Sequence, residues 1–433
     1  MNYIDNISFA LLLLAGVGFF VRNIKKLSRN IKLGKAVSKN DNPSKRWKNM
    51  LMVALGQSKM VKRPIAGMLH ILVYAGFIII NIEVIEIIID GLFGTHRVLS
   101  FLGGFYTFLI ASFEILAVLV LISVTIFWLR RMALRIPRFW NKEMMGFPKN
   151  DALYILYFEM VLMTLFLVMN ATDVSFQSAN SGNIVSKFLV PLFDGLHTNQ
   201  LHLIERTAWW LHIVGILVFL NYLYYSKHLH ILLAFPNTYF ANLEVKGKLN
   251  NLQAVTNEVK LMMDPNADPF AAAPETENDT PDKFGASDVT DLNWVQLMNA
   301  YTCTECGRCT SSCPANQTGK ELSPRAVMMK TRDRIEEVGK NIDKNGKFIP
   351  DNKQLLNDYI TPEEIWACTT CNACVEECPV NIDPLSIIVD LRRYLVMEQS
   401  AASQELNIMM TNIENNGAPW QYSQMDRLNW KDE

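Results

Sequence analysis

Five apolar segments occupy most of the first 235 residues and constrain the fold more than any other feature of the chain. They cover residues 7–21, 65–89, 101–129, 152–170 and 209–225. Crossing about 30 Å of hydrocarbon takes roughly 20 helical residues, so these segments predict transmembrane helices. The first is short and lies near the N-terminus, which makes a cleaved signal peptide the alternative. Because its basic residues follow the apolar run and no small-residue cleavage site is evident, we expect a retained helix.

The basic residues between these segments predict their orientation. Residues 22–63 hold 13 Lys or Arg and one Asp, and residues 130–149 hold six Lys or Arg and one Glu. The connections at 91–100 and 173–205 carry one Lys or Arg each. The positive-inside rule then places the N-terminus outside and everything after residue 235 in the cytoplasm.

The second half of the chain is polar and has few strand signals. Residues 236–288 include a stretch rich in Pro, Ala and acidic residues, which indicates a flexible linker. Residues 289–400 contain helical patterns, such as 323–339 with a proline after a serine cap. We therefore predict an all-α fold, with a five-helix transmembrane bundle over 1–235, a cytoplasmic helical domain over 289–400 and a tail over 401–433. The net charge is −1, so nothing points to nucleic acid.

All eight cysteines lie in two short runs, "CTECGRCTSSCP" at 303–314 and "CTTCNACVEECP" at 368–379. The thiols are too close in sequence for ordinary disulfides and indicate a metal site with reduced cysteines, which fits a cytoplasmic-type compartment. Such a run lets one loop place three thiolates around an iron–sulfur cubane while the fourth points toward a second cluster. A pair of four-cysteine zinc sites is the alternative, but zinc sites usually use paired knuckles.

The two runs resemble those of bacterial two-cluster ferredoxins. The resemblance implies two [4Fe-4S] clusters whose ligands are exchanged between the runs. Cluster 1 would take Cys303, Cys306, Cys309 and Cys378, and cluster 2 would take Cys368, Cys371, Cys374 and Cys313. The 54 residues between the runs are long for a compact two-hairpin ferredoxin, so we expect the α-helical ferredoxin type.

The seven histidines are candidates for binding haem without a covalent link, because none follows a Cys-x-x-Cys pair. His70 lies near the cytoplasmic start of the second apolar segment, and His230 lies at about the same depth on the fifth. An imidazole in hydrocarbon is costly unless it has a partner, so we predict that His70 and His230 ligate a b-type haem. The alternative is that His230 sits at the headgroup level beside Lys227.

His212 is the candidate ligand for a second haem. His212 and His230 are 18 positions apart in the sequence. If the fifth helix continues to His230, this separation makes five turns and places both on one face, about 27 Å apart. His228 is then rotated about 160° away from that face. No partner for His212 is evident on the second segment, where Ile80 and Asn81 stand. His96 and His202 lie in or near the outer connections, which suggests surface histidines or part of a quinone pocket.

Two further resemblances support this organisation. "GMLHILVYAGF" (67–77) and "LHIVGILVFLNYLYYSKHLH" (211–230) resemble the haem-binding helices of the gamma subunit of respiratory nitrate reductase, although the outer-haem ligand of that family falls at Ile80. The soluble half and the tail "NIENNGAPWQYSQMDRLNW" (412–430) resemble the iron–sulfur subunit of heterodisulfide reductase and related membrane complexes. Fused relatives carry a cysteine-rich (CCG) domain after such a tail, so we expect that domain in a separate catalytic subunit that docks on the tail.

The resemblances imply an electron-transfer subunit in the inner (cytoplasmic) membrane of a bacterium. Electrons would pass between a cytoplasmic partner such as a flavoprotein, two [4Fe-4S] clusters, one or two b haems and a membrane quinone. The alternative is a membrane-anchored ferredoxin that relays electrons between soluble partners without haem or quinone. A redox-driven transporter has little support, because the apolar segments hold few acidic residues beyond Glu83, Glu86, Glu114 and Glu159. Glu83 and Glu86 are candidates for a proton path to the quinone.

Overall fold

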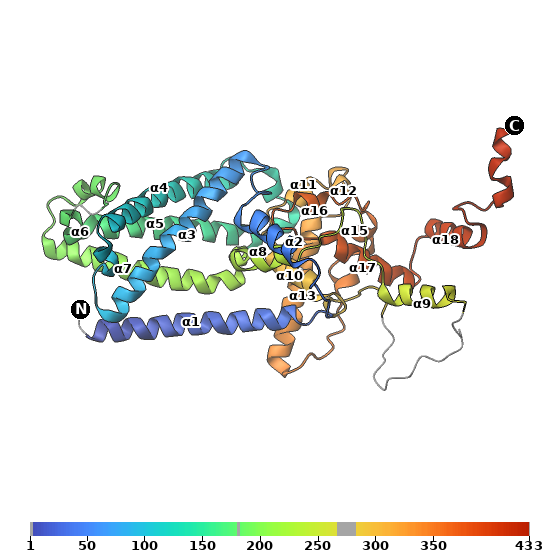
Figure 1. Cartoon of the computed structure of the whole chain (residues 1–433), viewed down its shortest axis with the longest axis horizontal. Coiled ribbons are helices and arrows are strands. Elements are labelled where there is room, and N and C mark those ends of the chain that lie inside the picture. The colour runs from blue at the N-terminus through green and yellow to red at the C-terminus, as the bar shows by residue number, and fades with distance from the viewer. Residues whose placement is uncertain (1–2, 180–181, 266–282, 433) are drawn as a thin grey trace.

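The computed structural model describes residues 3–179, 182–265 and 283–432, and within these residues the chain forms helices and no β-strand (Figure 1). Five helices are long and apolar enough to cross a membrane. They are α1 (Tyr3–Ile31), α3 (Pro64–Phe93), α4 (Gly104–Met132), α5 (Phe147–Thr172) and α7 (Thr198–Tyr222). The predicted all-α fold with five transmembrane helices is confirmed.

The five long helices form one bundle, in which α3 packs on α4, α4 on α5, α5 on α7, and α1 on α3 and α7. The bundle centre is filled by the buried rings of Phe113 and Phe166 and by Ile110 and Ile213. Side chains on the other faces, such as Leu11, stay exposed, as expected of helices that face lipid tails. Short helices connect or flank the long ones: α2 (Pro43–Met50), a π-helix (Leu51–Leu55), α6 (Val174–Ala179), and 3-10 helices at Val98–Leu102, Pro137–Phe139, Lys142–Met144, Ser186–Phe188 and Val190–Phe193.

Gly91 sets the close packing of α3 against α1, and its replacement provides a test of this contact. A methyl group at Gly91 would lie 2.6–2.8 Å from ring atoms of Phe9, which is almost fully buried. Small residues permit such close helix contacts in membranes, so we expect Gly91→Ala to lower stability by about 1–3 kcal/mol. Thermal unfolding in detergent measures this effect. Gly18→Ala on α1 is the control, because nothing lies within 4 Å of the Cβ that this substitution adds. Equal losses of stability in both variants would contradict the packing argument.

The expectation that the fifth transmembrane helix continues to His230 was wrong. Helix α7 ends at Tyr222, a 3-10 turn covers Leu223–Tyr225, and Ser226 is extended with φ −115° and ψ 159°. A second 3-10 turn (Lys227–Leu229) then leads into α8 (His230–Tyr239). The helical period therefore does not relate His212 to His230 or His228.

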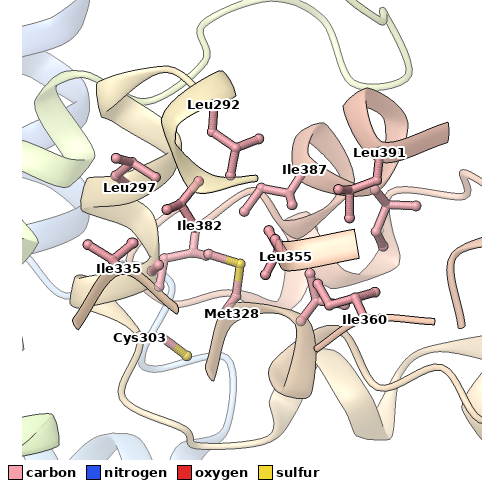
Figure 2. Close-up of a cluster of buried hydrophobic side chains, with 14 of the residues drawn as sticks. Leu292, Leu297, Cys303, Met328, Ile335, Leu355, Ile360, Ile382, Ile387 and Leu391 are labelled. Carbon is pink, nitrogen blue, oxygen red and sulfur yellow. The ribbon is translucent and has the colours of Figure 1, made fainter. Parts of the chain in front are cut away.

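The polar half forms a compact helical domain that packs against one end of the bundle (Figure 1). Its core is apolar and includes Leu297, Ile335, Leu355 and Ile387 (Figure 2). Its helices are α10 (Trp294–Thr302), α11 (Arg308–Ser311), α12 (Pro314–Gln317), α13 (Pro324–Asn345), α14 (Leu355–Asp358), α15 (Pro362–Trp366), α16 (Ala373–Glu377) and α17 (Pro384–Met397), with a 3-10 turn at Val289–Asp291.

The core of this domain extends into the membrane half of the chain. Leu27 of α1, Leu229 of the preceding 3-10 turn and Leu233 of α8 are buried in the same cluster as the α10 and α13 side chains. The backbone also links the two halves, because Lys35 N–H donates to Leu292 O at 2.8 Å. The stretch predicted as a linker contains the end of α8 and the helix α9 (Gln253–Met263), and its residues 266–282 lie outside the described residues.

The predicted tail contains α18 (Gln404–Asn416) and a 3-10 helix (Gln424–Lys431), which extend away from the helical domain (Figure 1). No residue of α18 is buried, and Trp420, Tyr422 and Trp430 are exposed. The role of the tail in docking a partner stays a prediction.

Candidate functional site

The two cysteine runs fold into loops with the same backbone pattern. Glu305 and Gly307 in the first run have φ of +54° and +71°, and Thr370 and Asn372, at the equivalent positions of the second run, have φ of +55° and +61°. These left-handed residues turn the chain between successive cysteines, so that each loop curves around a common point. A short helix follows each turn, α11 in the first run and α16 in the second, and the two helices pack together.

The thiols gather in two groups that cross between the runs. Cys303, Cys306 and Cys309 line one cavity together with Cys378 of the second run, with Cys374 also at its wall. Burial raises the pKa of Cys368, and the negative charges of the neighbouring thiols Cys313 and Cys371 raise this pKa further. Cys374 has Cys368 and Cys313 as its neighbours. Cys378 thus lies with the thiols of the first run and Cys313 with those of the second, while the assignment of each thiol to one of two clusters stays a prediction.

The spacing of these groups differs from that of a single-ion site. Among the described residues, no three His, Cys, Asp or Glu side chains converge closely enough to share one metal ion. A zinc ion holds thiolates at about 2.3 Å, which requires close convergence, whereas a cubane separates its four ligands more widely. The choice between zinc and a cubane rests on the spacing of the cysteines within the two runs.

Cationic residues surround the first thiol group. The Arg138 and Arg308 guanidiniums lie near Cys306, and Lys59 lies near Cys378. Burial lowers the pKa of Arg138 to about 10, and the negative charge of a Cys306 thiolate acts in the opposite direction. Arg308 is buried, and Arg138 and Lys59 are partly buried. This group of cations fits an anionic centre such as an iron–sulfur cluster with four thiolate ligands.

The first cysteine loop touches the end of the bundle on which the helical domain packs. Arg308 donates to Lys59 O at 3.3 Å and approaches Met60 Sδ at 3.0 Å. The carbonyl of Met60 lies next to Gly67, in the first turn of α3, and His70 follows one turn later. The cluster loop and the helix that carries His70 are therefore separated by a single segment of chain.

The structure places His70 and His230 side by side. Their ring centres are 6.4 Å apart and their planes are inclined by 41°. His230 Nδ1 lies 3.0 Å from the carbonyl oxygen of Lys227, so donation from Nδ1 leaves Nε2 free as a ligand atom. The Nδ1 atom of His70 is buried without a hydrogen-bond partner among the described residues.

His228 was expected to face away from this pair, and that expectation was wrong. Its ring stacks on His230, with centres 5.4 Å apart and planes inclined by 2°, and its Nε2 lies 3.8 Å from Glu159 Oε1. The extended backbone at Ser226 breaks the helix and redirects the residues that follow, so a helical period does not describe them.

Lys227 joins the histidine site to the first cysteine loop, a contact that the sequence interpretation missed. Its ammonium lies 2.5 Å from Glu305 Oε2 and 2.6 Å from Pro148 O. Glu305 stands between Cys303 and Cys306 and accepts a second hydrogen bond from Arg332 at 2.7 Å. The available signal was a carboxylate inside a cysteine loop and a lysine beside two histidines, but only the fold pairs them.

His212 lies deep in the bundle, apart from the other histidines. It is 2% exposed, its Nδ1 lies 3.0 Å from Leu162 O, and its ring contacts Phe166. Among the described residues, no other histidine ring contacts it. His96 and His202 lie at the end of the bundle away from the cysteine loops, where His96 Nε2 meets Asp173 at 3.1 Å and the side chain of His202 is 73% exposed.

Comparisons with known proteins agree with the cysteine site. Residues 299–382 match the family model of the 4Fe-4S dicluster domain. The chain is 30% identical over 448 aligned positions to the probable iron-sulfur-binding oxidoreductase FadF of Bacillus subtilis, covering 96% of this chain and 59% of the relative. It is 24% identical over 431 positions to EtfAB:quinone oxidoreductase of Syntrophomonas wolfei, covering 92% and 55%.

A more distant relative matches about a third of the chain. It belongs to the dihydromethanophenazine:CoB--CoM heterodisulfide reductase of Methanosarcina mazei and is 28% identical over 156 positions, which cover 34% of this chain and 36% of the relative. No solved structure matches the chain. The chain thus spans little more than half of the two relatives that it matches along most of its length. These findings show that the chain contains a 4Fe-4S dicluster domain and is similar to iron–sulfur oxidoreductases.

Proposed function

We propose that this chain is a membrane-anchored electron-transfer subunit of a quinone-linked oxidoreductase. Two [4Fe-4S] clusters in the cytoplasmic domain would exchange electrons with a b-type haem held by His70 and His230, and the haem would exchange them with a membrane quinone. The observation that carries this proposal is the paired imidazoles beside the first cysteine loop. The N-terminus would lie outside, in the cytoplasmic membrane of a bacterium.

The spacing of the two imidazoles fits a haem iron. An imidazole nitrogen binds a first-row metal ion at about 2.0 Å, so two rings on opposite sides of one iron have centres about 6 Å apart. The observed separation is 6.4 Å. His70 Nδ1, Tyr74 Oη and His228 Nδ1 are buried without hydrogen-bond partners among the described residues, which also suggests a site shaped for a further group. When bound, haem supplies one-electron chemistry, and the protein fixes its ligands and surroundings.

The exposure of the cysteines suggests the order in which electrons pass through the two clusters. Cys371, assigned to cluster 2, is exposed, whereas Cys303 and Cys378 of cluster 1 are buried next to the bundle. A soluble partner would therefore exchange electrons with cluster 2, and cluster 1 would pass them to the haem. The relative from Syntrophomonas wolfei is named as an EtfAB:quinone oxidoreductase, which supports a flavoprotein as that partner. A separate cysteine-rich catalytic subunit is a further candidate.

Haem content tests the proposed function. The protein is purified anaerobically in detergent, and haem, iron and acid-labile sulfide are measured per chain together with the reduced optical spectrum. We expect b-type haem that is reoxidised when a menaquinone analogue is added. Cluster-replete protein without haem would leave a membrane-anchored ferredoxin. Two haems per chain would mean that His212 binds the second one with a further ligand, and His96 and His202 would be tested next for that role.

The exchange of ligands between the cysteine runs predicts a specific pattern in double variants. Cys313 and Cys371 lie in different runs but are assigned to the same cluster, so Cys313→Ser/Cys371→Ser should keep the other cluster intact. Cys309→Ser/Cys313→Ser changes two neighbours in one run and should damage both clusters. Electron paramagnetic resonance of the reduced protein, with iron per chain, measures the outcome. If each run held its own cluster, the two results would be reversed.

A further inference from the structure

A cavity with a surplus of acidic groups lies at the end of the bundle opposite the cysteine loops. Five carboxyl groups and three cationic groups line it. They are Glu83, Glu86, Asp90, Asp173 and Glu205, with His96, Arg97 and Arg206. Glu114 and Tyr106 of α4 pack beside them. Because five carboxylates outnumber the cations in a largely buried space, the least stabilised carboxyl should keep its proton.

Two of these carboxylates have strong local donors. Asp90 accepts hydrogen bonds from Thr95 Oγ1 at 2.5 Å and from the backbone N–H groups of Arg97 and Val98 at 2.7 and 3.1 Å. Asp173 pairs with His96 at 3.1 Å and with Arg97 Nε at 3.2 Å. Burial alone would raise the pKa of Asp173, but these partners lower it to about 2. Asp173 is therefore a carboxylate at neutral pH.

The other carboxyl groups near Glu83 also have hydrogen-bond or ion-pair donors. Glu86 accepts from Leu99 N–H at 2.9 Å and from the Tyr106 hydroxyl at 3.1 Å, and Glu205 pairs with Arg206. Glu114, on the adjacent helix, accepts from Asn170 Nδ2 and from two backbone N–H groups. Each of these groups thus has a hydrogen-bond or ion-pair partner.

Glu83 is the exception. It is 3% exposed, and its Oε2 has no hydrogen-bond partner among the described residues. Its nearest cation is Arg97, whose Nη1 lies 3.7 Å from Oε1. That guanidinium already donates to Asp173 and Asn170. A buried carboxylate without donors is much less stable than the neutral acid, so this position favours a bound proton.

We propose that Glu83 is a proton-exchange site that opens to the aqueous phase on the side of the membrane away from the ferredoxin domain. Arg97 contacts Glu83 and Asp173, and Asp173 contacts His96, whose side chain is 52% exposed. Glu83 and His96 line the same cavity, and water in that cavity would carry the proton to the surface, because the Arg97 guanidinium keeps its own proton.

The role of this proton rests on the proposed function. A quinone that takes up two electrons to form quinol also takes up two protons, and the reverse reaction releases them. Glu83 would exchange such protons with the outer side, while the electrons travel through the haem and the clusters. Turnover would then change the pH on that side of the membrane.

Infrared spectroscopy tests the site without requiring quinone turnover. Purified protein in detergent is titrated from acid to alkaline pH, and the carbonyl stretch of protonated carboxyl groups is followed. We expect a band that is present at neutral pH, disappears at alkaline pH and is lost in Glu83→Gln. Glu114→Gln is the matched control and should keep the band. A carboxyl band that is unchanged in Glu83→Gln would overturn the proposal; any component that remains is assigned with Glu159→Gln, because Glu159 is another carboxyl group within the bundle.

Two further measurements separate this proposal from the proposed function. Glu83→Asp keeps a carboxyl group, so it should shift the band even if Glu83→Gln folds poorly; an unshifted band would also overturn the assignment. Haem and iron contents are determined on the same samples. If the Glu83 band is present in protein without haem, the proton site is supported and the quinone-linked function is rejected. If haem is present without the band, the proton site is rejected and the quinone-linked function is supported.

Discussion

Replacing either His70 or His230 by alanine should abolish haem binding while leaving both iron–sulfur clusters in place. Each imidazole would supply one axial ligand of the same iron, and their ring centres already lie 6.4 Å apart. Loss of one ligand leaves a buried five-coordinate iron and an empty volume beside it, so we expect almost complete loss of haem per chain. The Soret absorbance relative to iron content measures the effect.

Two control variants make this result specific. His202→Ala changes a side chain that is 73% exposed and should retain full haem. His228→Ala changes the ring stacked on His230 and should retain the haem with an altered spectrum or midpoint potential. If His228→Ala removes the haem and His230→Ala does not, the ligand assignment is wrong by two residues. Retention of haem in both His70→Ala and His230→Ala would reject the site.

The transmembrane bundle was predictable from sequence because the length of an apolar run is a local property. The end of the fifth helix was not, because distant residues determine it. Asp151 of α5 accepts a hydrogen bond from the Tyr222 hydroxyl at 2.7 Å and another from Lys227 N–H at 3.0 Å. These contacts stabilise a broken backbone in a stretch whose hydrophobicity alone favours a continuous helix. The break turns His228 toward His230.

The cysteine loops were predictable for a different reason. Three thiols at short, fixed spacings restrict the loop to a few conformations, and the repeated pattern made the two loops comparable. We predicted separate membrane and soluble domains from the change in composition along the chain. Composition does not show how the two halves pack against each other. Leu27 and Leu233 are apolar residues in the membrane half, and only the fold shows that they complete the core of the ferredoxin domain.

Breaking the ion pair between Lys227 and Glu305 should weaken the connection between the haem site and cluster 1. Their side chains are 9% and 3% exposed, and the two atoms are 2.5 Å apart. Removing one partner of a buried ion pair typically costs about 3–5 kcal/mol, because the remaining charge stays buried. Glu305→Gln removes the carboxylate nearest to both Lys227 and Arg332 and leaves them only longer contacts to Asp151 and Asp333, whereas Lys227→Met leaves Glu305 with Arg332. We therefore expect the larger defect in Glu305→Gln.

The defect should appear in electron transfer as well as in stability, because Lys227 also holds His230 through its carbonyl oxygen. Rapid mixing with a low-potential reductant that reduces the clusters first, followed at the haem absorbance, measures the transfer step. We expect slower haem reduction in Glu305→Gln, an intermediate rate in Lys227→Met and partial recovery in the double variant, which removes both charges. The control is Lys246→Met, which breaks a pair with Glu376 on an exposed surface and should change stability by at most about 1 kcal/mol. If haem reduction in Glu305→Gln is as fast as in Lys246→Met at equal haem and iron content, the pair does not position the two centres, and its contribution is confined to the stability of the domain contact.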